Sequence, residues 1–566
     1  MMRTLVKYSR LFKASAVAAI LMVACVTLQA RTVTFNASSV SRNTDLATAL
    51  NNRFNGLTCN DTAVISFDKS GTYILDGVVV LRCNVVISGM GADNTQLVLN
   101  KDDKKPLKGS DAFLGFSGRL GHPISVSIAD LSIKLKEHDG IWWETSEFHA
   151  IKIYHADKVD IRNVNSTMSN AFITNFDFRV CSNVNIQDCV ISNYNNCKGG
   201  GNLWLRGEMH NINIHNNKIY KYGNDEAVAF FSKTVDALRN TKGAISRTNI
   251  KVTDNEFYYQ HGDRVTNGLY NDMLFSVLTS LEDNVNCCDM RGFELARNKF
   301  VIDDLCKRII HLQFNAVDKH SDFDIHDNEF ITNKVNSSET FYFKNIEVKD
   351  ASATQDTIVV RNNRVTNNYA IMNPYNGSGY SFLLVNGGNV LLEGNKINNR
   401  VTTARGGKDY GIYLLWCEEA GGTVTLRSNV CKGLGRIATL ESGKGIQNFK
   451  LTAYNNYFQG RTTLYCKKIQ RLDLDFRQNT FESNHNDFFL QNFASRGTVV
   501  FNNNKVTVST NGGRLMGHYE GKSSSLRFEK LEVTGNEFHG VKSQDDLTKQ
   551  MTNVSKRKIK SNAFLK

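Results

Sequence analysis

Proline is scarce in this sequence: the 566 residues include only three. Proline has no backbone N–H and interrupts the hydrogen-bond ladder of a sheet, so its scarcity favours extensive parallel sheet. Beyond the first thirty residues, no apolar stretch approaches the length of a membrane span. We therefore expect no transmembrane segment. The sequence also contains no low-complexity linker that would separate two domains.

Cysteine is present twelve times, but the spacings do not match a zinc site. Export would permit disulfides. The candidate pairs are Cys59 with Cys83, Cys287 or Cys288 with Cys306, and Cys181 with Cys189 or Cys197. Three cysteines occupy apparent inward positions, where a buried small hydrophobic side chain is the favoured interpretation. These are Cys189, Cys431 and Cys466.

Residues 1–30 have the layout of a signal peptide. Residues 3–13 carry four basic and no acidic side chains, and residues 16–24 are apolar. Leu28-Gln29-Ala30 is an acceptable cleavage site. A rival is a lipobox ending at Cys25, which would leave that residue lipidated, but it begins with Met where Leu is usual. We expect an exported protein, in the periplasm, at the cell surface or secreted.

Positive charge is in excess. The formal net charge is +13, and +9 remains after removal of the four basic residues of the signal segment. This excess suits an anionic partner, although the solvated surface of a long rod explains it equally well. No nucleic-acid-binding motif is recognisable, so nucleic acid is not an expected partner.

A short phrase recurs along most of the chain. Its clearest first instance is NINIHNNKI at residues 211–219, with alternating apolar residues, two spacers, an Asn, a spacer and another apolar residue. Gaps of 23 to 43 residues separate successive instances. The Asn positions are Asn217, Asn255, Asn298, Asn328, Asn363, Asn395, Asn429, Asn456, Asn479, Asn504, Asn536 and Asn562. Repeats of this length indicate a solenoid or a propeller.

The phrase has a direct structural interpretation. Alternating apolar residues make a strand with one face inward. The spacers and the Asn make a sharp corner, because Asn tolerates a left-handed backbone. Each unit is too short for a propeller blade and has no helical period. The sequence therefore predicts an all-β fold, a single-stranded right-handed parallel β-helix (solenoid), with coils about 4.8 Å apart and an internal Asn ladder.

The opening of the folded chain differs from its repeats. Residues 31–121 are the predicted N-terminal cap and first coils, and residues 122–566 the regular coils of the same continuous domain. Within the first part, Asn43 to Leu50 reads as a short amphipathic helix that caps the open end of the solenoid.

Three segments follow this helix: GTYIL at 71–75, NVVISGMG at 84–91 and TQLVL at 95–99. A helical cap, a "G-T-Y" strand, a strand ending in "G-x-G" and a "T-x-L" strand resemble the opening of the pectate-lyase-like superfamily, in an exported bacterial form. The resemblance implies a substrate groove along the sheet that precedes the phrase. It does not imply one activity, because this fold hosts lyases, hydrolases, isomerases and binding proteins.

Long turns indicate where the groove lies. Residues 232–249, 258–271 and 281–292 are long insertions around three successive coils, and long segments in a compact fold are usually functional. The paired Asp-Asp after Gly and the Gly-His-Gly of polygalacturonase-type hydrolases are both missing; Asn224-Asp225-Glu226 is a loose echo.

Strand alternation then selects side chains. In residues 202–210, Leu203 and Leu205 point inward, so Trp204 and Arg206 point outward. The same rule gives a row of outward polar and aromatic side chains: Asp177, Arg179, Trp204, Arg206, Glu208, His210, Asp225, Glu226, His311, Gln313, Tyr342 and Lys344. Aromatic rings stack on sugars, and Arg pairs with carboxylate or sulfate.

Two mechanisms fit this row. A glycoside hydrolase needs two carboxyl groups across the scissile bond. Asp225 or Glu226 would supply one, and Glu208 or Asp177 the other. A polysaccharide lyase needs a base, together with a cation that neutralises a uronate carboxylate. The lyase candidates are Arg206, Arg179, His311 and Lys344, and Ca²⁺ held by Asp225 and Glu226 is an option.

The row therefore predicts an exported enzyme that cleaves a polysaccharide, most plausibly an anionic one, with no required cofactor. The predicted catalytic residues are Asp225, Glu226, Glu208, Arg206 and His311. The predicted substrate-binding residues are Trp204, Arg179, Asp177, Gln313 and Lys344. The alternatives are a non-catalytic glycan-binding or adhesin-like surface protein and a purely structural one; a polar turn at Asp225-Glu226 would fit either.

Overall fold

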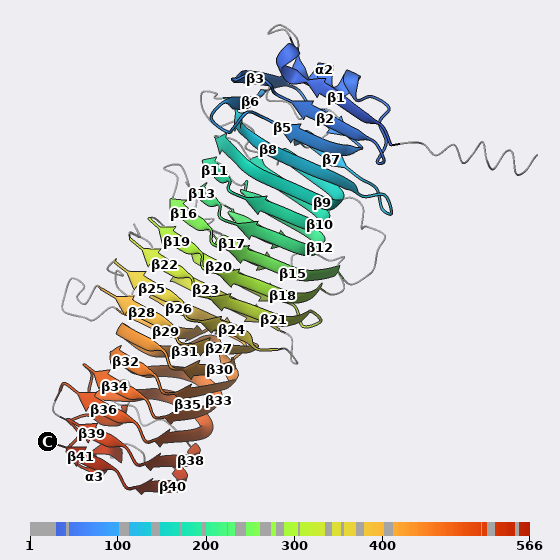
Figure 1. Ribbon diagram of the computed structural model, residues 1–566. Coiled ribbons are helices and arrows are strands. Elements are labelled where there is room, and N and C mark those ends of the chain that lie inside the picture. Colours follow the sequence, from blue (N-terminus) through green and yellow to red (C-terminus); the bar gives the residue numbers. More distant parts are fainter. Residues whose placement is uncertain are drawn as a thin grey trace, which may run out of the picture.

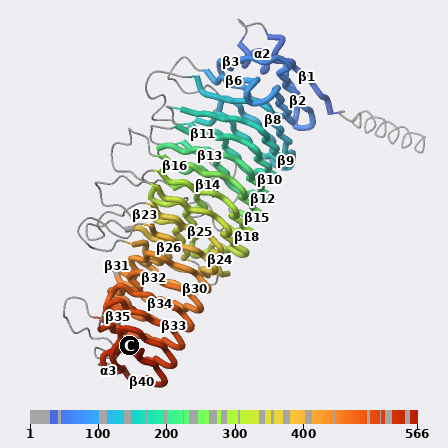
Figure 2. Tube along the Cα trace, turned by 60° about the vertical axis from the view of Figure 1, so that its left-hand side comes forward, coloured from blue at the N-terminus to red at the C-terminus, as the bar shows by residue number. Residues whose placement is uncertain are grey.

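The computed structural model is an elongated solenoid in which the chain winds repeatedly around one long axis (Figure 1). Nearly all its elements are strands, and the strands pair in parallel with those of the coils before and after. Figure 2 traces the same winding from a second direction. The described residues are 30–565 without 41–44, 101–111, 137–147, 170–172, 195–199, 224, 232–244, 261–272, 279–287, 304–305, 334–341, 352–355, 369–378, 401–410, 511, 518–526 and 549–553.

The strands form three faces. Face 1, which precedes the phrase in each coil, contains β4 (Val79–Leu81), β7 (Ala112–Ser117), β14 (Val228–Phe231), β17 (Met273–Leu278), β20 (Arg308–Phe314), β23 (Tyr342–Asp350), β26 (Gly379–Asn386), β29 (Ile412–Cys417) and β37 (Arg514–Gly517). Face 2, which carries the phrase, contains β1 (Thr32–Asn36), β2 (Thr62–Ser66), β5 (Asn84–Ser88), β15 (Ile245–Thr253), β18 (Cys288–Ala296), β21 (Lys319–His326), β24 (Ile358–Arg361), β27 (Asn389–Glu393), β30 (Gly422–Arg427), β38 (Arg527–Thr534) and β40 (Val554–Lys560).

Face 3, which follows the Asn corner, contains β3 (Gly71–Asp76), β6 (Thr95–Asn100), β11 (Val190–Tyr194), β13 (Lys218–Tyr222), β16 (Glu256–Gln260), β19 (Lys299–Ile302), β22 (Glu329–Thr332), β25 (Arg364–Asn367), β28 (Lys396–Asn399), β32 (Tyr457–Gly460), β34 (Thr480–Ser483), β36 (Lys505–Val508), β39 (Glu537–His539) and β41 (Ala563–Leu565). Long strands bend around a corner and join two or more faces: β8 (Ile124–Leu135), β9 (Phe148–Ser169), β10 (Ile173–Gln187), β12 (Leu203–His215), β31 (Val430–Tyr454), β33 (Leu464–Arg477) and β35 (Asp487–Asn502).

The predicted Asn ladder is confirmed along the corner between faces 2 and 3. Asn363 shows its hydrogen bonding: its N–H and its side-chain amide both donate to Asn395 Oδ1, at 3.0 Å each, and the amide also donates to Ile325 O at 2.9 Å. Asn328 makes the same pair of bonds to Asn363 Oδ1. The links continue without a break from Asn217 to Asn562.

The sequence suggested that the ladder Asn itself takes the left-handed backbone conformation at the corner. In the structure the residue before it does so. Asn362 has φ +54° and Arg297 has φ +56°, whereas no ladder Asn has positive φ. The ladder Asn needs extended geometry to aim its amide along the solenoid axis, so its neighbour makes the turn.

In the first coils, apolar side chains occupy the position that Asn takes in the later coils. Apolar side chains also occupy the next inward position after the corner in each coil. Cys189 is in the ladder column, as predicted, where its N–H donates to Asn217 Oδ1 at 3.0 Å. After the corner, Phe257, Phe300 and Phe330 stack with centroids 4.8 and 5.1 Å apart. Burying these rings excludes water from the amide ladder, which strengthens each of its hydrogen bonds.

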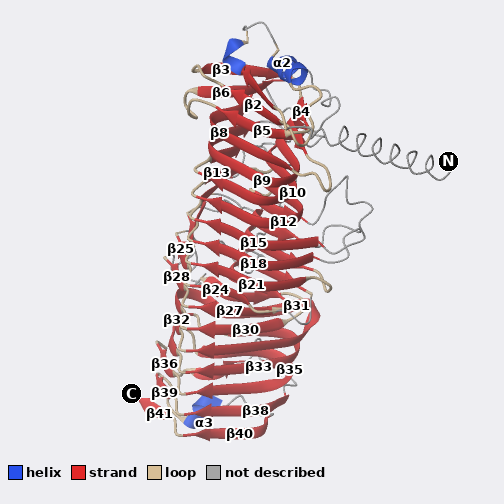
Figure 3. Cartoon of the chain, turned by 45° about the vertical axis from the view of Figure 1, so that its right-hand side comes forward, coloured by secondary structure: helices blue, strands red, loops and turns tan. Residues whose placement is uncertain are grey.

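A helix stands at the N-terminal end of the solenoid (Figures 1 and 3). Helix α2 (Leu46–Arg53) begins at Asp45, whose carboxylate accepts from the N–H groups of Ala47 and Thr48, and it buries Leu46 and Leu50. This helix starts later than the predicted 43–50, and its capping function stays a prediction. Two shorter helices are η1 (Ala37–Ser39) and α3 (Gln544–Thr548).

The cysteine pairs proposed from spacing are largely wrong. Cys59, Cys83, Cys181 and Cys189 all carry free thiols. Cys306 Sγ donates to Arg308 O at 3.0 Å. Cys197 and Cys287 lie outside the described residues. A disulfide needs two Cα atoms about 4.4–6.8 Å apart with their Cβ atoms directed towards each other, and spacing along the chain does not establish either.

Cys189, Cys431 and Cys466 are buried, as predicted. Burial raises the pKa of each thiol, and for Cys189 it reaches about 12, so the three act as small apolar side chains.

Residues 1–29, with the signal segment and Cys25, lie outside the described part. The right-handed winding and the boundary at residue 121 stay predictions. Within the described ranges, no helix has the length and apolar character required to span a membrane.

Replacing Asn363 with Leu should destabilise the fold by about 1–3 kcal/mol, because partners of its amide in both neighbouring coils lose their bonds. Asn448 is exposed and carries no ladder bond, so Asn448→Leu is the matched control. Urea unfolding of both variants measures the difference. Equal stability of the two would contradict a stabilising ladder.

Candidate active site

The outer side of face 1 carries a buried ionic cluster at the predicted position. Asp177 of β10 lies beside Trp204 of β12, and Arg179 lies beside Arg206. Asp177 is contacted by Arg179 Nε at 2.7 Å, by Arg206 Nε at 3.1 Å and by His149 Nε2 at 3.4 Å. One carboxylate therefore faces two guanidinium groups and an imidazole.

Electrostatics hold this carboxylate ionised. Burial of Asp177 opposes ionisation, but His149, Arg206 and Arg179 outweigh it, and the pKa of Asp177 lies below its ordinary value. Guanidinium groups in this position can pair with the carboxylate or sulfate group of a ligand.

Trp204 forms one wall of the cluster. Arg206 lies over its ring at 4.6 Å, and Phe231 meets the ring edge-on at 5.5 Å. Its indole N–H is buried and has no hydrogen-bond partner among the described residues. A Cβ on Gly201 would come within 2.1 Å of this nitrogen, so the glycine leaves room for the indole. An unpartnered donor in a polar cluster is ready to bind a ligand oxygen.

Glu226 lies in the turn before β14, beside the cluster. It is 6% exposed. Burial, and then the neighbouring charge of Asp225, raise the pKa of Glu226 to about 8; Lys221 and Arg206 offset this only in part. The Arg206 guanidinium favours the ionised form of both Glu226 and Asp177 and so acts to lower the pKa of each.

Asp225 supports the turn. It adopts φ +69°, and its Oδ2 accepts the N–H of Gly200 at 2.9 Å. The described residues contain no group of three or more His, Cys, Asp or Glu side chains placed to hold a metal ion. Calcium bound by Asp225 and Glu226 stays a prediction, and the chemistry of face 1 does not require it.

Two expectations about this region are wrong. Trp204, Arg206 and Asp177 point away from the core, as alternation predicted, but they do not face solvent, since each is at most 6% exposed. Glu208 does not join them, because Gly207 at φ +78° starts the corner towards face 2. The Glu208 carboxylate is half exposed and bonds His210 Nε2 at 3.0 Å.

A second cluster on face 1 surrounds Glu347, which the sequence analysis missed. Glu347 is fully buried and is contacted by Arg308 Nε, by Lys349 Nζ at 3.4 Å and by Lys344 Nζ at 3.7 Å. Burial opposes its ionisation, but Lys344 and Arg308 outweigh it and lower the pKa of Glu347 to about 2. Three cations thus share one carboxylate.

His311 and Lys344 were predicted site residues, and the structure brings both to this cluster. His311 lies beside Glu347 on the neighbouring strand, and burial lowers its pKa to about 3, so the imidazole is neutral. Its Nδ1 lies 2.8 Å from Met273 Sδ, and its Nε2 has no partner among the described residues. Burial also lowers the pKa of Lys344. Gln313 is half-buried beside Lys349.

The two clusters lie in one row along the solenoid. Trp204 pairs with Ala229, then Ser276, then His311 on successive strands of face 1, so about 14 Å separates Trp204 from His311. In this row the small side chains of Ala229 and Ser276 stand between them, and the buried Ser276 Oγ has no hydrogen-bond partner in the described part of the chain. The predicted long turns at 232–249, 258–271 and 281–292 lie mostly outside the described residues.

Comparisons with known proteins identify no family. No family model matches the sequence, and no curated protein matches it. Similar solved structures include the A-module of an Azotobacter vinelandii mannuronan C-5 epimerase, AlgE6, at 12% identity over 92% of this chain and 96% of that chain, with TM-score 0.23.

Two further structures are comparably distant. A tailspike protein of E. coli bacteriophage HK620 in complex with a pentasaccharide shares 11% identity over 92% of this chain and 75% of that chain, with TM-score 0.31. The catalytic domain of a GH87 alpha-1,3-glucanase in complex with tetrasaccharides shares 12% identity over 88% of this chain and 68% of that chain, with TM-score 0.25. Similarities this low carry no activity to this chain.

The raised pKa of Glu226 predicts a pH-dependent stability. The folded state keeps a proton up to about pH 8, whereas an unfolded Glu has a pKa near 4.5. This contribution to stability is complete below the unfolded pKa and is lost as pH rises through the folded pKa. Between about pH 5 and about pH 8, wild-type Tm should therefore fall more than that of Glu226→Gln. Parallel Tm profiles would contradict the buried acid.

Proposed function

We propose that face 1 is the active site of an exported enzyme that cleaves an anionic polysaccharide, on a solenoid wound in the right-handed sense and capped by α2. The supporting observation is that two carboxyl groups on which Arg206 acts differ in protonation: Glu226 keeps its proton near neutral pH, and Asp177 does not. A glycoside hydrolase uses such a pair, a protonated general acid and an ionised nucleophile or base.

In this mechanism Glu226 donates its proton to the leaving glycosidic oxygen. Asp177 acts from the other side of the bond, as nucleophile or as base for water. Trp204 stacks on a sugar ring, and its N–H, together with Arg206, holds a substrate oxygen. Because these side chains are almost fully buried, a substrate must displace the atoms that cover them.

The anionic character of the substrate follows from the charges. Cationic side chains line both clusters, with Arg179 and Arg206 around Asp177, and Arg308, Lys344 and Lys349 around Glu347. Such groups form charge-assisted hydrogen bonds with carboxylate and sulfate. Uronate or sulfate groups on neighbouring sugars would pair with them along the row.

A lyase centred on Glu347 is the second candidate. Arg308 or Lys349 would neutralise the uronate carboxylate. Lys344, with its lowered pKa, or His311, with its unpartnered Nε2, would take the proton beside it. The C–H electron pair then forms a double bond in the sugar as the glycosidic C–O bond breaks, and the proton taken by the base passes to the leaving oxygen. A non-catalytic glycan-binding protein would use the same row without turnover.

Glu226→Gln tests the hydrolase directly. The amide keeps the shape of the carboxyl group but cannot donate its proton, so turnover should fall about 100-fold or more. The measurement is reducing ends released from polygalacturonate, alginate and chondroitin sulfate. Glu208→Gln is the matched control, since Glu208 is exposed and outside the cluster. Full activity of Glu226→Gln, with folding unchanged, would remove Glu226 from the mechanism.

Lys344→Met tests the lyase. If elimination occurs, absorbance of unsaturated uronates should appear with the wild-type protein and fall about 100-fold in this variant, because the proton acceptor is gone. Lys450→Met is the control, as Lys450 is exposed on face 2. Reducing ends without unsaturated product would assign the hydrolase; neither product from any substrate would leave glycan binding as the function of face 1.

A further inference from the structure

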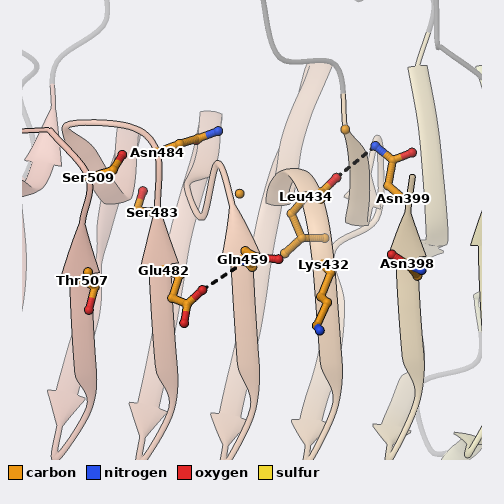
Figure 4. Close-up of a pocket in the computed structure, with 13 residues that line it drawn as sticks. Asn398, Asn399, Lys432, Leu434, Gln459, Glu482, Ser483, Asn484, Thr507 and Ser509 are labelled. Carbon is orange, nitrogen blue, oxygen red and sulfur yellow. Dashed lines mark hydrogen bonds between the residues drawn. The ribbon is translucent and has the colours of Figure 1, made fainter. Parts of the chain in front are cut away.

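A long polar groove crosses face 3, away from both clusters. One hollow of about 540 Å³ lies over β28, β31, β32, β34 and β36, and a second of about 400 Å³ lies over β22, β25, β28 and β31. The hollows share Asn398 and Lys432, so they form one groove parallel to the solenoid axis. In Figure 4, Asn398, Lys432, Gln459, Glu482 and Thr507 stand side by side on successive strands.

Glycines border the groove where backbone segments approach each other closely. A Cβ on Gly433, at φ +70°, would come within 2.6 Å of Asn399 O, and one on Gly460, at φ +117°, within 2.5 Å of Leu434 O. A Cβ on Gly411 would meet Gly435 N at 2.1 Å. At these positions backbone packs against backbone, so only glycine fits.

Three exposed cations line the groove: Arg364, Lys396 and Lys432. Glu329 lines it too and is the cross-strand neighbour of Arg364, but no ion pair within 4.0 Å joins any of the three cations to an acidic group in the described part of the chain. On its other side Arg364 neighbours Lys396. Like charges in that position repel each other and destabilise a sheet.

Face 2 shows the contrast. There Arg427 pairs with Glu393 at 2.6 Å, and Arg361 pairs with Asp324 at 2.7 Å. The same solenoid therefore neutralises cations across neighbouring coils on face 2 and leaves three of them without acidic partners in the groove. Positive charge without an internal partner is the arrangement expected of an anion-binding surface.

The remainder of the groove offers hydroxyl and amide groups. Gln459, Asn484, Thr507 and Ser509 line it, and Glu482 accepts from Gln459 Nε2 at 3.1 Å. Such groups exchange hydrogen bonds with sugar hydroxyls but do not stack on nucleobases, and none of the described residues that line the two hollows is aromatic.

We propose that this groove is a second, non-catalytic binding site for an acidic polysaccharide, whose carboxylate or sulfate groups pair with Arg364, Lys396 and Lys432. The chain lies along the solenoid axis and spans six coils, about 24 Å from β25 to β36. Its hydroxyls bond the amide and hydroxyl side chains beyond Lys432. The groove does not depend on face 1 being an enzyme, because it holds the polymer whether or not a bond is cut.

The test compares two double variants of the full-length protein with equal loss of charge. Lys396→Ala with Lys432→Ala removes groove cations; Lys218→Ala with Lys450→Ala removes two exposed cations outside the groove. Gel retardation and titration calorimetry use polygalacturonate for carboxylate, dextran sulfate for sulfate, dextran as a neutral polymer, and single-stranded DNA. Cleavage of a short oligosaccharide is measured in parallel.

The groove variant should bind at least one acidic polysaccharide about tenfold more weakly, while the control stays within about twofold of wild type. Whichever of polygalacturonate and dextran sulfate shows the loss identifies the anion. Equal losses in both variants, no binding by wild type, or DNA as the strongest ligand would overturn the proposal. If the groove variant cleaves the short oligosaccharide as fast as wild type, its weaker binding does not come from damage to face 1. If wild type binds the polysaccharide in the groove but cleaves nothing, the result counts against the proposed enzyme and not against the groove.

Discussion

The whole molecule depends on one hydrogen-bond arrangement, the amide ladder at the corner between faces 2 and 3. Each ladder Asn, such as Asn363, ties its own coil to the coils on both sides through buried bonds of 2.9–3.0 Å. An unmatched amide in that position would leave a buried polar group unsatisfied in each of two coils. The ladder thereby sets the register of all three faces, and the register places the side chains of face 1 in rows.

The repeat made most of the fold predictable. The phrase at 211–219 showed both the inward residues and the Asn that links the coils, and the structure confirms both. The disulfides were not predictable, because sequence spacing alone does not say whether the side chains of Cys59 and Cys83 approach each other in the fold. The left-handed corner residue was also missed, because the ladder position hides that Asn362, not Asn363, makes the turn.

The site was predictable only in part, for a physical reason. Alternation correctly directed Trp204 and Arg206 outward, but it says nothing about what covers a strand, so their burial was missed. It also fails where the alternation breaks. In β23 the core residues are Phe343, Ile346 and Val348. Two residues lie between Phe343 and Ile346, where strict alternation would place one. That irregularity turns Glu347 outward beside Lys344, which strict alternation would not predict.

The central claim is that face 1 binds and cleaves a polysaccharide between Asp177 and Glu226. A crystal structure of Glu226→Gln with a short acidic oligosaccharide tests it most directly. We expect a sugar ring on Trp204, an anionic group at Arg179 or Arg206, and the glycosidic oxygen within hydrogen-bond distance of residue 226. Sugar density confined to faces 2 and 3, with the Asp177 cluster unchanged, would contradict the account.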